Sequence, residues 1–144
     1  MTGRRERTTS MLLALTITVA GCGPAAVQGP PDTGARGTAR AFFEALIHQD
    51  WPAAFATIDP DRQAGLRADA FAAQAKQYRD GHGFEPDAVL FRGCEEQGDQ
   101  AVAHVVVTGK SAEGRRQFRD SVKLRKTPAG WRIVRVDGFG KEQR

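Results

Sequence analysis

The stretch QAVAHVVVTGKSAEGRRQFRDSVKLRKTPAGWRIVRVDGF, residues 100–139, decides the fold. Apolar and polar side chains alternate along it with the period of two that is typical of half-buried strands. The pattern predicts four strands, at residues 84–92, 100–108, 115–126 and 130–139. Short loops containing Gly or Pro join them, so we expect antiparallel neighbours. Pro86 favours an edge position for the first strand, because proline cannot donate to a ladder.

The residues before this stretch have a helical period instead. Between residues 38 and 50 apolar side chains recur at steps of three and four, at Ala39, Phe42, Phe43, Leu46 and Ile47. Pro52 suits the first turn of a second, short helix that we expect to stop at Asp59-Pro60. A third helix is predicted from Asp69 to about Gly81. The sequence thus predicts an α+β fold with N-terminal helices packed on a curved antiparallel four-stranded sheet.

Two groups of residues carry a resemblance to a known family. They are AFFEAL at 41–46 with Asp50, Trp51 and Ala54, and VKL at 122–124 with GWRIV at 130–134. In this order, over about residues 38–139, the sequence resembles the nuclear transport factor 2-like superfamily. That is the cystatin-like, cone-shaped α+β fold also seen in ketosteroid isomerase, and the closest resemblance is to small bacterial lipoproteins of unknown function. These are core and turn positions, so the resemblance implies a fold and no activity.

The N-terminus has the layout of an export signal. Residues 1–10 are polar and basic, and residues 11–20 (MLLALTITVA) form a short apolar run. Ala20, Gly21 and Cys22 follow it. A basic start, a short apolar middle and a small-residue end are typical of a secretory signal peptide. The run is about half of the roughly 20 residues that a membrane-spanning helix needs, which makes a transmembrane anchor the weaker interpretation.

The end of this signal, Val19-Ala20-Gly21-Cys22, resembles the bacterial lipobox. The resemblance implies cleavage between Gly21 and Cys22, and acylation of Cys22 with chains such as palmitate. Two or more chains anchor a protein stably in a membrane. The alternative is an ordinary secreted protein in which the cysteine falls there by chance.

Three segments follow from this interpretation. They are a signal peptide at 1–21, a lipidated flexible tether at 22–37 rich in Gly, Pro and Ala, and a folded domain at 38–144. We expect an exported protein attached to the cell membrane or the outer membrane through acylated Cys22. Its domain would then lie in the periplasm or outside the cell.

Two polar residues on apolar strand faces are candidate pocket groups. A turn centred on Ala112 would place His104 opposite Asp120 across the sheet. The next turn, at Pro128-Ala129, would place Asp137 opposite Asp120, with Arg135 one diagonal step away. A histidine oriented by an aspartate is a usable general base. The alternative is a structural pair, in which His104 or Arg135 neutralises a buried Asp120.

Composition excludes several other functions. The formal net charge of +4 is too small to favour nucleic acid. Only two cysteines occur, and no CxxC pair or histidine cluster is present, so we expect no metal and no cofactor. Cys94 is then a small buried apolar residue. The chain has no nucleophile motif, and its one tyrosine, Tyr78, lies at the end of a helix with no evident partner for Asp120. We therefore do not expect an enzyme.

Three functions remain in order of preference. The first is a lipid-anchored, non-enzymatic binding or scaffold domain of the cell envelope. The second is a small-molecule or enzymatic pocket inside the cone that uses His104 and Asp120. The third is protein interaction or homodimerisation through the outer sheet face, where Val134 and Val136 are expected beside Arg132. A basic strip also lies on the last two strands, at Arg115, Arg116, Arg119, Lys123, Arg125 and Arg132. It could rest on anionic headgroups or simply be a solvated face.

Overall fold

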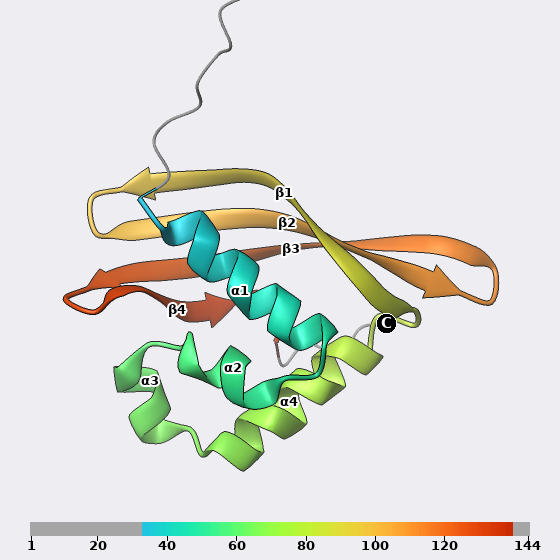
Figure 1. Ribbon diagram of the computed structural model, residues 1–144, viewed down its shortest axis with the longest axis horizontal. Helices are drawn as coiled ribbons and strands as arrows, with labels where there is room; N and C mark the ends of the chain where they lie inside the picture. Colours follow the sequence, from blue (N-terminus) through green and yellow to red (C-terminus); the bar gives the residue numbers. More distant parts are fainter. Residues whose placement is uncertain (1–32, 140–144) are drawn as a thin grey trace, which may run out of the picture. The chain divides into compact units, whose positions relative to one another are not determined.

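A computed structural model describes residues 33–139, in which helices precede one four-stranded sheet (Figure 1). The helices are α1 (Ala35–Ile47), α2 (Trp51–Ala56), α3 (Pro60–Gly65) and α4 (Ala68–Asp80). The strands are β1 (Glu85–Gln97), β2 (Gln100–Ser111), β3 (Gly114–Thr127) and β4 (Gly130–Val136). All pairs are antiparallel in the order β1-β2-β3-β4. The predicted α+β fold is confirmed, with β1 at an edge as Pro86 indicated.

The N-terminal predictions fall outside the described residues. These are the signal at 1–21, the cleavage site at Gly21 and Cys22, and the acylated thiol. Among the helices that the structure describes, none is long and apolar enough to span a bilayer.

Helix α3 is a departure from the sequence prediction. Asp59-Pro60 was expected only to end a helix; α2 ends at Ala56, shortly before it, and the dipeptide also begins α3. The Asp59 carboxylate accepts a hydrogen bond from the N–H of Asp61 at 3.0 Å, which caps the new helix. Pro60 occupies its first turn, where no N–H partner is needed. The same dipeptide can stop one helix and start the next, and the sequence pattern showed only the stop.

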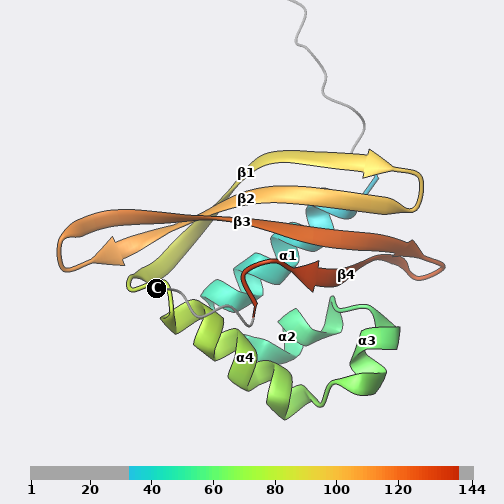
Figure 2. The same ribbon diagram turned by 180° about the vertical axis from the view of Figure 1, so that it is seen from behind.

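One face of the sheet is covered by helices, and the other carries none (Figures 1 and 2). We call these the inner and the outer face. The inner face packs against aromatic side chains of α1 and α4, namely Phe42, Phe43, Phe71 and Tyr78, all at most 5% exposed. Phe139, after β4, lies among them, with its ring centroid 4.9 Å from that of Tyr78 and 5.9 Å from that of Phe42. Cys94 packs at the margin of this core as a partly buried residue.

The register between β2 and β3 differs by one residue from the prediction. Ser111 pairs with Gly114 around a two-residue turn, and Gly114 adopts a φ of 122° there. His104 therefore pairs with Ser121, and Asp120 pairs with Val105. The expected pairing of His104 with Asp120 is wrong, because a slip of one residue moves a side chain to the other face of a sheet.

The turn between β3 and β4 was predicted correctly, but a bulge follows it. Arg125 pairs with Arg132 as expected, and the register then shifts between Lys123 and Leu124, leaving Val134 unpaired. The shift turns Val136 to the inner face, where it is 7% exposed. Val134 and Val136 thus do not form the apolar patch beside Arg132 that was expected. Homodimerisation through the outer face stays a prediction.

Candidate functional site

A buried polar pair joins α4 to β3. The Tyr78 hydroxyl donates to Oδ2 of Asp120 at 2.8 Å. The other carboxylate oxygen, Oδ1, accepts from the backbone N–H of Ser121 at 2.7 Å and from that of Gly138 at 3.1 Å. A Cβ at Gly138 would lie 2.6 Å from Oδ2 of Asp120 and from Cε2 of Tyr78. Glycine is thus required at this turn, because any side chain would enter the pair.

The environment of this pair raises the pKa of both groups. Burial raises the pKa of the Asp120 carboxyl above its usual 3.8, although the hydrogen bonds from Tyr78, Ser121 and Gly138 lower it. Burial, and then the charge of Asp120, raise the pKa of Tyr78 well above 10. The prediction that Asp120 lacks a partner is wrong. Tyr78 shares a helix face with the buried Phe71 and Ala75, a signal that its phenol points into the core.

His104 lies on the opposite side of the sheet from Asp120. Its Nδ1 is 2.9 Å from Oγ of Ser121, and its Nε2 is 3.8 Å from Oε1 of Glu95. Its side chain is 44% exposed. Arg135 pairs with Asp137 at 3.1 Å. Neither His104 nor Arg135 neutralises Asp120, so both the proposed His–Asp general base and the structural pair are wrong.

The interior between α1 and the sheet has almost no free space. The space lined by Phe43, Leu46, Tyr78 and Val107 is about 10 Å³. A cavity of that size is at the lower limit for one water molecule. A ligand between α1 and the sheet would need the aromatic core to move.

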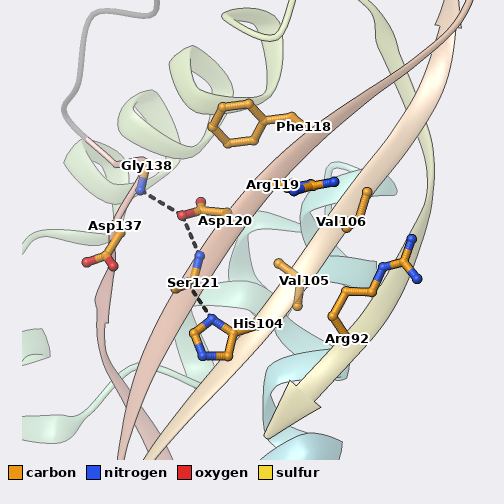
Figure 3. Close-up of a pocket in the computed structure, with 10 residues that line it drawn as sticks. All are labelled: Arg92, His104, Val105, Val106, Phe118, Arg119, Asp120, Ser121, Asp137 and Gly138. Atoms are coloured by element: carbon orange, nitrogen blue, oxygen red, sulfur yellow. Dashed lines mark hydrogen bonds between the residues drawn. The ribbon is translucent and has the colours of Figure 1, made fainter.

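A much larger hollow lies over β2 and β3, with a volume of about 900 Å³ (Figure 3). Its lining includes Arg92, the outer-face residues His104, Val106, Arg119 and Ser121, and the inner-face residues Val105, Phe118 and Asp120. The predicted pocket groups His104 and Asp120 thus both line this hollow, although they lie on different faces of the sheet. It reaches the turn at Asp137 and Gly138, where β4 has ended. A second hollow of about 660 Å³ lies between α4 and β4. Leu66, Phe71 and Val134 are in its lining, together with Arg135, which pairs with Asp137, and Arg62, which pairs with no carboxylate among the described residues.

Ion pairs neutralise half of the predicted basic strip. Arg115 binds both carboxylate oxygens of Asp87, at 2.9 and 3.1 Å. Arg116 pairs with Glu113. Arg125 donates to Asp59, which is 1% exposed, at 2.8 Å. In the part of the chain that the structure describes, Arg92 and Arg119 pair with no carboxylate. Arg36, Arg62 and Arg132 also pair with no carboxylate among the described residues, but only Arg92 and Arg119 belong to the wall of the large hollow.

Comparisons with known proteins identify the fold. No protein-family model and no curated protein sequence matches the chain. A SEC-C motif containing protein from Psychrobacter arcticus superposes with a TM-score of 0.56 at 14% identity, over 76% of this chain and 63% of that one. An NTF2-like protein from Campylobacter jejuni gives 0.53 at 16% identity, over 69% and 96%.

An NTF2-like protein of unknown function from Shewanella oneidensis gives a TM-score of 0.50 at 12% identity, over 69% of this chain and 90% of that one. At such identities the likeness shows the fold alone. The described domain has the NTF2-like α+β fold, as the sequence resemblance implied.

Proposed function

We propose that the chain is a lipid-anchored, non-enzymatic binding protein of the cell envelope, and that its ligand site lies on the outer face of the sheet. One observation carries this proposal. The space between α1 and the sheet is about 10 Å³, whereas a hollow of about 900 Å³ opens over β2 and β3, with His104, Val106 and Arg119 of the outer face in its wall. Ligand pockets typically have volumes of about 300–1,000 Å³. The 900 Å³ hollow falls in this range, as does the smaller 660 Å³ hollow between α4 and β4, and the space under α1 does not.

The arrangement of titratable groups supports binding over catalysis. Tyr78 donates to Asp120, and Asp120 also accepts from the backbone N–H groups of Ser121 and Gly138, so both groups are already engaged within the fold. On the outer face, His104 contacts the hydroxyl of Ser121, and the nearest carboxylate, Glu95, is 83% exposed. A general base needs a group that holds its ring in place. An exposed glutamate side chain holds it poorly.

The anchor rests on the sequence of the first 22 residues. A basic start, a short apolar run and the ending Val19-Ala20-Gly21-Cys22 support export, cleavage and acylation of Cys22. Ten residues separate Cys22 from Thr33, where the described chain begins. Such a segment spans at most about 40 Å. The binding domain would therefore stay near the membrane surface.

Replacing Cys22 with serine tests the anchor. Cells that express the full chain are grown with radiolabelled palmitate, and the protein is followed in membrane and soluble fractions. We expect the wild type to be labelled and membrane-bound. Cys22→Ser should lose all labelling and keep residues 1–21, because the peptidase requires the acylated cysteine.

Cys94→Ser is the matched control, since Cys22 and Cys94 are the only cysteines of the chain. It should be labelled like the wild type. Labelling that persists in Cys22→Ser, or that disappears in Cys94→Ser, would contradict the anchor.

A further inference from the structure

We infer that the outer-face hollow is a binding site for a phosphate group, held between the guanidinium groups of Arg92 and Arg119. The inference deepens the proposed function and rests on it, since that function places the ligand on this face. It names the chemistry of the ligand, a phosphate group that either a soluble phosphorylated molecule or a lipid headgroup supplies.

Two local features of the sheet bring the arginines to one place. Arg119 on β3 pairs with Val106 on β2, whose other neighbour is Leu90 on β1. Arg92 is the extra residue where the register of β1 shifts between Phe91 and Gly93, so the ladder gives it no partner. Bulges commonly redirect a side chain in this way. The two arginines thus reach the hollow from opposite sides of β2.

The floor of the hollow between the two arginines is the apolar side chain of Val106, which is shielded from solvent. Val106 is 1% exposed although it lies outside the core cluster that packs against the helices. In Figure 3 the side chains of Arg92 and Arg119 lie beside Val106. Arginine stems often cover apolar surface while the charged heads stay in water. Both arginines line the hollow above this apolar floor.

Arg92 and Arg119 are the two arginines in the wall of the hollow, and neither contacts a carboxylate among the described residues. Arg36, Arg62 and Arg132 also contact none, but they lie outside this wall. The carboxylates of the wall are already engaged, Asp137 by Arg135 and Asp120 by Tyr78. Two guanidinium groups that share one hollow repel each other. An anion between them would remove this repulsion. The planar guanidinium fork matches phosphate and carboxylate oxygens with two parallel hydrogen bonds.

The remaining groups favour phosphate over carboxylate. Two guanidinium groups that each bind two oxygens need more oxygens than one carboxylate has, whereas a phosphate group has enough oxygens for both arginines. The hydroxyl of Ser121 and the ring of His104 add polar groups to the same wall. Nothing lies within 4 Å of a Cβ built at Gly93, the β1 partner of His104, so this side of the hollow is open. Phe118 and Val106 offer apolar contact to the rest of the ligand.

A phosphate titration tests the site. The processed chain, residues 22–144 with Cys22→Ser, is titrated with inorganic phosphate, and the arginine side-chain Nε–Hε resonances are followed by NMR. Potassium chloride at equal ionic strength is the reference. We expect a saturable shift of the Arg92 and Arg119 signals with phosphate. Loss of one charge-assisted contact should weaken binding about 10- to 100-fold in Arg92→Gln and in Arg119→Gln.

Arg115→Gln is the matched control, because it removes the same charge from the same strand but from a guanidinium already bound to Asp87. Its affinity should stay within about twofold of the unsubstituted chain, since the contacts to phosphate are unchanged. Equal weakening by all three substitutions would overturn the site, because it would show attraction by net charge alone. Identical shifts with chloride would also overturn it.

Vesicles distinguish the two sources of phosphate. The same variants are sedimented with phosphatidylglycerol vesicles and with phosphatidylcholine vesicles. Binding to phosphatidylglycerol that requires Arg92 and Arg119 supports a lipid headgroup, and phosphate binding without vesicle binding supports a soluble ligand. No arginine-dependent binding in either assay overturns the inference. Because this chain carries no acyl groups, such a failure is separate from the outcome of the palmitate experiment.

Discussion

Replacing Phe42 with alanine is expected to lower the free energy of unfolding by about 3–5 kcal/mol, the usual cost of removing a buried phenyl ring. Phe42 is fully buried. Its ring lies 5.3 Å from that of Phe43, in an edge-to-face arrangement, and 5.9 Å from that of Phe139. The cavity left behind cannot close without shifting these neighbours. Since small domains are stable by about 5–15 kcal/mol, the variant should be close to unfolding at 37 °C.

Urea denaturation at 25 °C measures this effect, with Leu90→Ala as the control. Leu90 is a large apolar residue that is 49% exposed on the outer face. Its replacement should change the free energy of unfolding by no more than about 0.5 kcal/mol. A cost below about 1 kcal/mol for Phe42→Ala would mean that the interior is loosely filled. A ligand pocket inside the fold would then again be a reasonable hypothesis.

Replacing Tyr78 with phenylalanine should cost about 1–3 kcal/mol at pH 7, because it leaves Oδ2 of a buried carboxylate without a donor. The phenol is the only side-chain donor to Asp120 among the described residues. We expect this cost to shrink as the pH falls. Once Asp120 is protonated, the missing hydrogen bond concerns a neutral group, which is cheaper to leave unpaired.

The direction of this pH dependence follows from the pKa of Asp120. Burial raises that pKa above 3.8, so the folded state binds the proton more tightly than the unfolded state does. The stability that this group contributes is therefore fully present below pH 3.8 and is lost as the pH rises through the raised pKa. Tyr78→Phe removes an interaction that lowers the pKa, so it should raise the pKa of Asp120 further and deepen that loss.

Unfolding curves of the wild type and Tyr78→Phe at several pH values between 3.5 and 8 check this prediction. The same pair of measurements in an Asp120→Asn background is the control, because asparagine does not titrate. There the cost of Tyr78→Phe should not vary with pH. A pH-independent cost in the Asp120 background would show that the phenol does not act through the carboxylate.

The filled interior also decides where function is sought. In this chain the space between α1 and the sheet is occupied by Phe42, Phe71 and Phe139. The large hollow lies over β2 and β3, and its two arginines, Arg92 and Arg119, pair with no carboxylate among the described residues. A domain held near a membrane by Cys22 would thus display its ligand site on an exposed sheet surface rather than inside the fold.

The sequence by itself determined the class of fold, because local patterns carry that information. The helical period before Gly81 and the period of two after it depend only on neighbours along the chain. The turn at Pro128-Ala129 was also visible, since its residues select the turn locally. These patterns predicted the helices covering one face and the order of the strands.

Only the tertiary structure decided which side chains meet. Val105, Val106 and Val107 are consecutive, so the sequence does not show which side chains of β2 face the core. The turn between β2 and β3 lies one residue away from its predicted position, and this turn sets the register. The bulge in β4 left no periodic signal, and it moved Val136 inward. The meeting of Tyr78 with Asp120 joins residues 42 apart.

The candidate site shows the same division. Arg119 was part of a basic strip visible in the sequence, but Arg92 was not, because a bulge in another strand brings it there. Which arginines are neutralised depends on acids from distant segments, such as Asp59 for Arg125 and Asp87 for Arg115. Local periodicity reports which face of an element is apolar. Charge pairing depends on three-dimensional neighbours, and these are set only when the elements pack.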